Sequence, residues 1–129
     1  ETSLSGAMTF AQHLLETTTH AAARQVVDIS GNGPDSTGIP LHAARQRLHA
    51  TGATVNGLAL PRQAFGADGP YATLFAGYDG PLDAWFRREV IGGPGAFALT
   101  VDPDTGFAEA ILRKLVLEIA WAGTTEGRP

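Results

Sequence analysis

The 129-residue sequence contains no cysteine, which excludes disulfide bonds, thiolate metal sites and a cysteine nucleophile. Basic residues are few and scattered, with nine Lys and Arg against 13 Asp and Glu and a net charge of −4. This balance excludes the basic stripe with which proteins bind nucleic acid or anionic lipid. No apolar run approaches the ~20 residues needed to cross a bilayer, so no transmembrane segment is expected.

The start of the sequence also lacks the basic and apolar regions of a signal peptide. It opens with Glu1 rather than Met. We therefore expect a processed or incomplete chain.

Helical and extended patterns alternate along the sequence. Helices are expected after an N-cap at Ser3 or Ser5, over Leu41–Ala50, from Pro81 onward and over Thr105–Trp121, and strands over Arg24–Ile29, Thr54–Leu60 and Ala96–Val101. This alternation predicts an α/β fold, a doubly wound, mostly parallel, Rossmann-like sheet with helices on both faces. Residues 1–122 form the predicted domain part and residues 123–129 a flexible tail.

Three strands are few for such a sheet. The first strand is rich in β-branched apolar residues, Val26, Val27 and Ile29, which predicts a central position rather than an edge. Its Asp28 lies mid-strand and must find hydrogen-bond partners, most simply in a structural network with a strand that is absent. We therefore expect N-terminal strands to be missing from this chain, which would be half a domain.

The last helix and the glycine-rich segments give further expectations. A core stripe is predicted at Phe107, Ile111, Leu115 and Ile119, with Glu109–Arg113 and Lys114–Glu118 as outward pairs. Arg45, Arg47 and all four histidines (His13, His20, His42, His49) are expected at the surface. Gly92, Gly93 and Gly95 suit a tight crossing near the carboxyl edge of the sheet better than a phosphate loop, because neither they nor Gly31-Asn32-Gly33 match a nucleotide motif.

The clearest candidate site follows the first strand. Ligands of open α/β sheets bind where loops leave the carboxyl ends of strands. The predicted binding loop therefore contains Ser30, Gly31, Gly33 and Asp35, with Asn32 between the two glycines. For Asn32, a turn role alone and residual polar or metal binding remain equally open. Asp35 is most simply a solvated loop residue.

Several segments resemble one known family. They are SLSGAM at residues 3–8, VDISGNGP at 27–34, TVNGL at 54–58 and VIGGPGAF at 90–97, followed by FAEAI at 107–111 and RKL…EIA at 113–120. Together they resemble the C-terminal half of a bacterial domain-of-unknown-function family with a von Willebrand factor A-like fold. The resemblance spans nearly the whole chain and implies a secreted or periplasmic protein.

The resemblance also implies a metal-ion-dependent adhesion site. In that fold an Asp-x-Ser-x-Ser segment, absent here, is completed by a threonine and an aspartate, whose positions fall on Ser3 and Asn32. The ion would be Mg²⁺ or Ca²⁺, held by oxygen ligands. Because Asn32 lacks a full negative charge, we expect a weakened or vacant site.

The resulting expectation is a protein–protein interaction module of von Willebrand factor A type and not an enzyme. Its partner would be the missing N-terminal half or a separate subunit. Aromatic residues of the long irregular stretch 61–80, Phe65, Tyr71, Phe75 and Tyr78, are candidate partner contacts. The main alternative is a metal-free structural subunit of a larger assembly. A small hydrolase or nucleotide-binding enzyme is less favoured, because the sequence has no G-x-S-x-G elbow.

Overall fold

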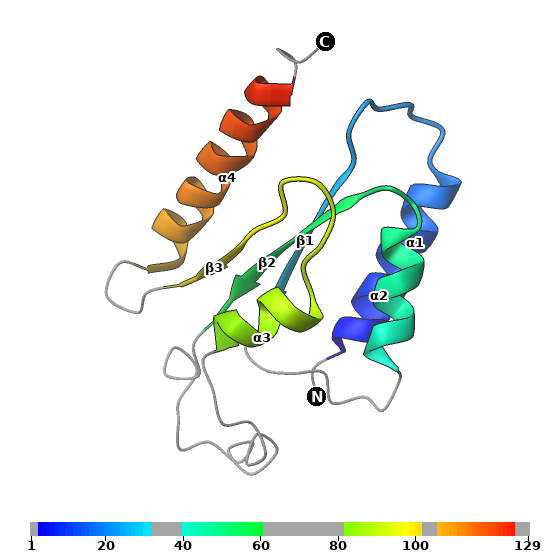
Figure 1. The fold of residues 1–129 in the computed structure, drawn as a ribbon, viewed down its shortest axis with the longest axis horizontal. Helices are drawn as coiled ribbons and strands as arrows, with labels where there is room; N and C mark the ends of the chain where they lie inside the picture. The colour runs from blue at the N-terminus through cyan, green and yellow to red at the C-terminus, as the bar shows by residue number, and fades with distance from the viewer. Residues whose placement is uncertain (1–2, 32–39, 61–81, 102–105, 126–129) are drawn as a thin grey trace.

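The computed structural model describes residues 3–31, 40–60, 82–101 and 106–125 of the chain, and the side chains of the last helix from 108 to 120. Helices and strands alternate as the sequence predicts (Figure 1). The elements are α1 (Leu4–Thr17), β1 (Val26–Gly31), α2 (Leu41–His49), β2 (Thr54–Ala59), α3 (Leu82–Glu89), β3 (Ala98–Thr100) and α4 (Gly106–Thr125). The fold class, α/β with a parallel Rossmann-like sheet, is therefore confirmed.

The three strands form one parallel sheet in the order β1-β2-β3. The prediction that the first strand is central is wrong for the described residues, because β1 lies at an edge and β2 lies between the other two. All six residues of β2 are buried, whereas β1 exposes Asp28 and Ser30. Small residues suit β2 to the centre: a Cβ atom at Gly57 would lie 2.6 Å from the Phe86 ring, so a helix can approach the strand closely there.

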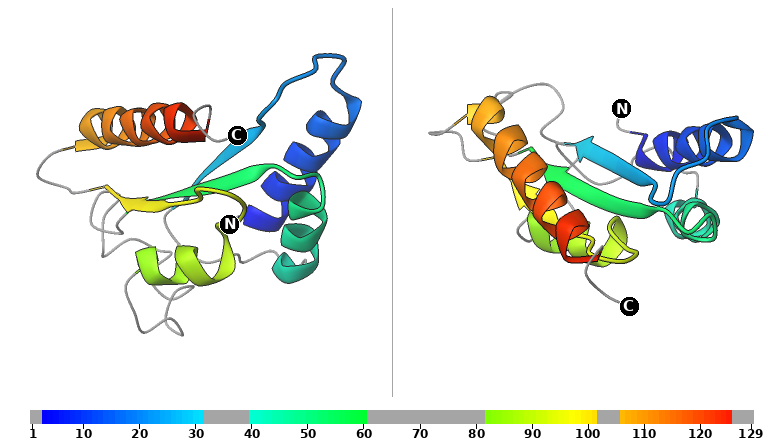
Figure 2. Two further views of the ribbon diagram at one scale, coloured as in Figure 1. Left: turned by 45° about the horizontal axis from the view of Figure 1, so that its top comes forward. Right: turned by 90° about the horizontal axis from the view of Figure 1, so that it is seen from above.

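Helices cover both faces of the sheet. α3 lies on one face and α4 on the other (Figure 2). The face of α3 also carries α1 and α2, and its apolar core contains Leu4, Met8, Ile29, Ala44, Leu48, Val55, Ala59, Trp85, Phe86, Val90 and Ala98. A second and smaller apolar cluster, Leu58, Val101 and Ala110, lies under α4. We refer to these two sides as the α1–α3 layer and the α4 layer.

The glycine-rich segment after α3 makes the expected tight crossing, but at the other end of the sheet. Gly92 pairs with Val55 near the start of β2, with N···O distances of 2.8 and 3.1 Å. Gly93 has a φ of +91°, and a Cβ atom there would lie 2.8 Å from the carbonyl oxygen of Ala53. The crossing therefore lies at the amino edge, because the chain must return there before β3 can run parallel to β2.

The prediction that α4 turns its apolar stripe toward the core is wrong for the described side chains. Leu115 and Ile119 are exposed, whereas Lys114 and Glu118 face the sheet. Ile111 alone of the described stripe residues packs against the small cluster of the α4 layer. The helix adopts this orientation because the sheet beneath it offers polar side chains to Lys114 and Glu118, as described below.

Candidate functional site

The predicted site lies where the strands end. β1 and β2 end, and α1 and α2 begin, on the same side of the molecule (Figure 1). Of the predicted site residues, Ser3, Ser30 and Gly31 lie within the described part of the chain. Asn32, Gly33, Asp35, Phe65, Tyr71, Phe75 and Tyr78 lie outside the described residues. Of the two predicted metal ligands, the structure therefore describes Ser3 but not Asn32.

Ser3 begins the first helix. Its hydroxyl oxygen accepts a hydrogen bond from the Gly6 N–H at 3.2 Å, which satisfies one of the donors that a helix start leaves unpaired. The side chain is exposed, and a hydroxyl oxygen that accepts one hydrogen bond keeps a second lone pair. Ser3 can therefore serve as a helix cap and still offer an oxygen to a cation.

Ser30 and Gly31 form the end of β1. The carbonyl oxygen of Gly31 accepts a hydrogen bond from the Leu60 N–H at 2.8 Å, so this glycine is buried inside the ladder between β1 and β2. Ser30 is exposed and lies on the α4 side of the sheet, because side chains alternate along a strand and Ile29 packs in the α1–α3 layer. Of the two residues, only Ser30 offers a side-chain oxygen.

A polar cluster lies between the sheet and α4. It consists of Asp28 on β1, Asn56 on β2, and Lys114 and Glu118 on α4. Asn56 is almost wholly buried, and its amide nitrogen donates to Glu118 Oε1 at 2.9 Å and to Asp28 Oδ1 at 3.4 Å. Its Oδ1 accepts from the Phe97 N–H at 3.1 Å. The Asn56 amide is therefore hydrogen-bonded at both ends and joins β2 to β1, α4 and the segment before β3.

Lys114 completes the polar cluster. Its ammonium group pairs with Asp28 Oδ2 and lies 3.5 Å from Glu118 Oε2. Burial alone would lower the pKa of Lys114, but the hydrogen bond and charge of Asp28, with a further contribution from Glu118, raise it above its ordinary value. An ammonium held protonated in this way is neither a nucleophile nor a general base. The polar cluster fixes α4 on the sheet.

Part of this arrangement was predicted. The expectation that Asp28 joins a structural network is confirmed, but the expectation that its partner lies on an absent strand is wrong. Asn56 lies directly beside Asp28 in the parallel register, and both interrupt apolar strands. These two neighbouring polar residues within apolar strands could have predicted that a polar helix face covers them.

The α1–α3 layer contains two further polar side chains, Arg45 and His49, whose partial burial was not predicted. His49 and Arg45 were expected to point outward, yet both are partly buried against the turn after α3. Arg45 Nη2 donates to the Ile91 carbonyl oxygen at 2.7 Å. Burial, and then the charge of Arg45, lower the pKa of His49 below its ordinary value of 6.5. Protonation of His49 is therefore disfavoured in the folded protein.

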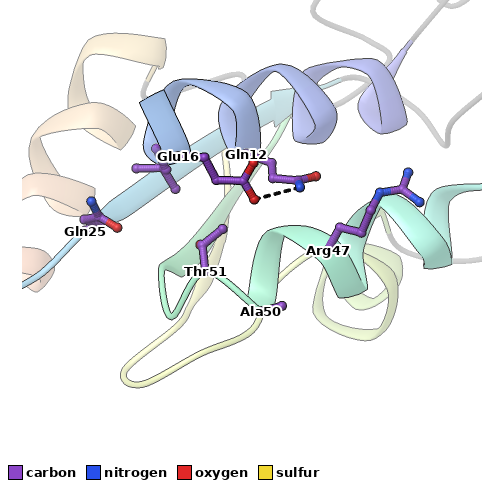
Figure 3. Close-up of a pocket in the computed structure, with 7 residues that line it drawn as sticks. Gln12, Glu16, Gln25, Arg47, Ala50 and Thr51 are labelled. Atoms are coloured by element: carbon purple, nitrogen blue, oxygen red, sulfur yellow. Dashed lines mark hydrogen bonds between the residues drawn. The ribbon is translucent and has the colours of Figure 1, made fainter. Parts of the chain in front are cut away.

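A pocket of about 320 Å³ lies between α1 and α2 (Figure 3). It is lined by Gln12, Leu15, Glu16, Gln25, Arg47, Ala50 and Thr51. Gln12 Nε2 donates to Glu16 Oε1 at 2.9 Å, so these two polar groups bond to each other rather than converge on the cavity. The pocket also lies beside the start of β1, away from the strand ends where the predicted loop begins.

The outer face of α4 is apolar. Leu112, Leu115, Val116 and Ile119 are 43–72% exposed and follow the i, i+3, i+4, i+7 spacing of one helix face. We call these four residues the α4 stripe. A helix at the surface of a globular protein normally shows the opposite arrangement, with apolar residues toward the core and charged residues outward. The α4 stripe is therefore an exposed apolar surface on a helix whose charged residues Lys114 and Glu118 face the sheet.

Within the described residues, no three His, Asp or Glu side chains gather in a way that could hold a metal ion. Nor does any described helix combine the length and apolar character needed to span a membrane. A family model with the description "Protein of unknown function (DUF1194)" matches residues 1–123. No curated protein and no solved structure matches the chain.

Proposed function

The chain belongs to the DUF1194 family, and on that premise we propose that it is a protein–protein interaction module with a von Willebrand factor A-like fold. In this proposal the chain is the C-terminal half of such a domain, and Ser3 and Asn32 belong to a weakened site for Mg²⁺ or Ca²⁺. From the same resemblance we propose a periplasmic or secreted location. We assign no catalysis to the chain. The observation that carries the interaction role is the exposed α4 stripe.

The stripe favours a partner for energetic reasons. Burying a large aliphatic side chain stabilises an assembly by about 1.5–3 kcal/mol relative to leaving it in water. Four such side chains lie on one face of α4, while Lys114 and Glu118 are turned inward. These apolar side chains are not stabilised by contact with water, but burial against an apolar protein surface would stabilise them. A partner that packs on α4 would therefore bury the four side chains that this orientation exposes.

The topology supports the von Willebrand factor A-like part of the proposal. A parallel sheet with helices on both faces is what the resemblance implies for this half of the fold. The Ser3 hydroxyl also stands at the start of α1, on the side of the molecule where β1 ends. That is where an oxygen ligand and the loop after β1 would meet a cation.

The interaction role is tested on the protein purified from its natural source. Native mass spectrometry, repeated after denaturation, is expected to reveal a second polypeptide with an Asp-x-Ser-x-Ser segment. The double variant Leu112→Ser/Val116→Ser should lose that polypeptide. The control Arg113→Ser, at an exposed position of the same helix, should keep it. A lone, monomeric and cooperatively folded wild-type chain would contradict the proposal.

The metal site is tested by restoring the missing charge. Adding a carboxylate next to a divalent cation contributes on the order of 1–2 kcal/mol, so Asn32→Asp should tighten Mg²⁺ or Ca²⁺ binding by about 5- to 30-fold. Isothermal titration of the native complex measures this change. Gln46→Glu, which adds the same charge on the exposed side of α2, should leave the affinity unchanged.

A second candidate is a metal-free structural subunit of a larger assembly. The observation that favours it is the Ser3 hydroxyl, which already has a structural task as the cap of α1. Under this alternative the second polypeptide copurifies as before, but neither the wild type nor Asn32→Asp binds a divalent cation. Metal titration of the wild type and of Asn32→Asp therefore separates the two candidates.

A further inference from the structure

α2 contacts the turn after α3 (residues 90–95) through two basic side chains. Arg45 and His49 lie one helical turn apart on α2, so both project from the same face of that helix. Arg45 Nη2 donates to the Ile91 carbonyl oxygen at 2.7 Å. The His49 imidazole lies against Gly92, where a Cβ atom would come within 2.6 Å of Nε2. The ring can lie there only because Gly92 has no side chain.

The same turn is joined to the start of β2. Gly92 donates its N–H to the Val55 carbonyl oxygen at 3.1 Å and accepts from the Val55 N–H at 2.8 Å. The Thr54 hydroxyl donates to the Pro94 carbonyl oxygen at 2.8 Å. Val55 is fully buried in the core of the α1–α3 layer. His49 therefore packs on the residue through which the turn is paired with a core strand.

The surroundings of His49 suit a neutral ring and not a charged one. Within the described residues, His49 Nε2 is buried without a hydrogen-bond partner, and so is Arg45 Nε. Burial, and then the positive charge of Arg45, lower the pKa of His49. A charge on a buried nitrogen is costly unless a hydrogen bond or an opposite charge compensates it. Here the neighbouring charge has the same sign, so protonation favours an arrangement that returns the ring to water.

No carboxylate of the described residues forms an ion pair with Arg45 or His49. β2 and the turn after α3 contain no titratable side chain. The other titratable side chains of the three helices in this layer are exposed or already paired: His13 and Glu16 on α1, His42 and Arg47 on α2, and Asp83, Arg87, Arg88 and Glu89 on α3. Among the described side chains at this contact, His49 is therefore the group whose charge changes near neutral pH.

We propose that His49 is an acid-sensitive latch between α2 and the turn after α3. As a neutral imidazole it packs on Gly92 and holds the turn on β2. As an imidazolium it leaves Gly92 for water, and the pairing of Gly92 with Val55 opens while the rest of the sheet stays formed. This local opening is distinct from global unfolding. It involves neither the proposed partner nor the proposed metal site, so its test is independent of both.

Residue-resolved hydrogen exchange across the acid range tests the latch. Because the ring binds its proton more readily in the open form, the open population should rise by up to about tenfold for each pH unit below the ordinary pKa of 6.5, and level off below the folded-state pKa. The protection factors of the Val55 and Gly92 amides should fall accordingly. The amides of Gly57 and Val101, which belong to the pairing of β2 with β3, should change far less. Constant protection at Gly92, or an equal fall at all four amides, would overturn the latch.

A matched pair of variants assigns the effect to His49. In His49→Gln, which keeps a polar side chain that does not titrate, the protection of Gly92 should stay constant over the same pH range. In His42→Gln, at an exposed position of the same helix, it should fall as in the wild type. A fall that persists in His49→Gln contradicts the proposal. If that variant does not fold, the titration of the His49 side chain in the wild-type protein, followed by nuclear magnetic resonance, takes its place. Protection at Gly92 must level off at the pH where His49 itself becomes protonated, and a different midpoint overturns the latch.

Discussion

The two faces of the sheet are attached to their helices in different ways. In the α1–α3 layer, eleven buried apolar residues from three helices, three strands and the turn after α3 form one continuous core. In the α4 layer, the apolar cluster has three buried residues, with Leu60, Leu99 and Ile111 packed against it. The polar cluster of Asp28, Asn56, Lys114 and Glu118 adds hydrogen bonds and ion pairs. Buried apolar surface attaches the helices of the α1–α3 layer to the sheet, whereas α4 is also attached by hydrogen bonds and ion pairs.

This difference explains the two roles of the layers. Apolar burial is non-directional and supplies most of the stability of a fold. Hydrogen bonds and ion pairs contribute less net free energy but require defined geometry. The polar cluster therefore sets how α4 is rotated on the sheet, and that rotation presents the α4 stripe outward. The α1–α3 layer has a continuous apolar core, whereas the α4 layer leaves the apolar α4 stripe exposed.

The largest effect is expected in the apolar core of the α1–α3 layer. Phe86 is fully buried against Gly57, and Phe86→Ala should reduce the free energy of unfolding by about 3–5 kcal/mol, through lost burial and the cavity left behind. Leu99→Ala, at a half-buried position in the α4 layer, should cost less than about 2 kcal/mol. Urea unfolding of both variants measures the difference. Equal losses would show that the two layers are equally packed.

The polar cluster is the next most sensitive feature. Lys114→Met leaves two carboxylates without their cation, and should reduce the free energy of unfolding by about 1–3 kcal/mol. Arg113→Met, an exposed neighbour on the same helix, should stay within about 0.5 kcal/mol of the wild type. Neutralising the carboxylates as well, with Asp28→Asn and Glu118→Gln, should recover part of the loss. No recovery would mean that the lysine stem, rather than its charge, stabilises α4.

The two layers should also respond oppositely to pH. The pKa of Lys114 is raised, so its contribution to stability is complete below its ordinary value of 10.5 and is lost as pH rises through the folded-state value. The pKa of His49 is lowered, so stability is complete above its ordinary value of 6.5 and declines as pH falls toward the folded-state value. Unfolding free energies measured across both ranges test this contrast.

Variants assign each branch of that pH dependence. His49→Gln should flatten the acid branch, and the control His42→Gln, at an exposed position of the same helix, should not. Lys114→Met should flatten the alkaline branch and leave the acid branch unchanged. If the loss of stability at acid pH persists in His49→Gln, other titratable groups cause that loss.

The sequence predicted the layers better than their arrangement. Helix and strand periodicity is local, so the alternation of elements and the Ser3 cap were predicted correctly. Strand order is not local. The apolar residues of β1 indicate that it is suited to two neighbours, but not which of them this chain supplies. The inference that β1 lacks a neighbour remains a prediction.

The rotation of α4 could not be predicted from α4 alone. Its sequence carries apolar residues on more than one face, so periodicity does not identify the face that meets the sheet. Asp28 and Asn56, more than 50 residues earlier, decide the rotation, because each needs a hydrogen-bonding partner above the sheet. The candidate site divides in the same way. Ser3 caps α1 as predicted, Ser30 belongs to β1 rather than to the loop after it, and Asn32 and Asp35 lie outside the described residues.

The smallest effect on the free energy of unfolding is expected at Ser3, the N-cap of α1 and a candidate metal ligand. Ser3→Ala removes the cap of α1 and should cost about 1 kcal/mol, whereas Ser3→Asp keeps an acceptor for the Gly6 N–H and should cost almost nothing. Thermal unfolding with and without Mg²⁺ separates the two roles of the hydroxyl. If Ser3 is only a cap, the loss in Ser3→Ala is the same in both conditions. If Ser3 also binds a cation, Mg²⁺ stabilises the wild type and Ser3→Asp but not Ser3→Ala, because only the first two keep an oxygen there.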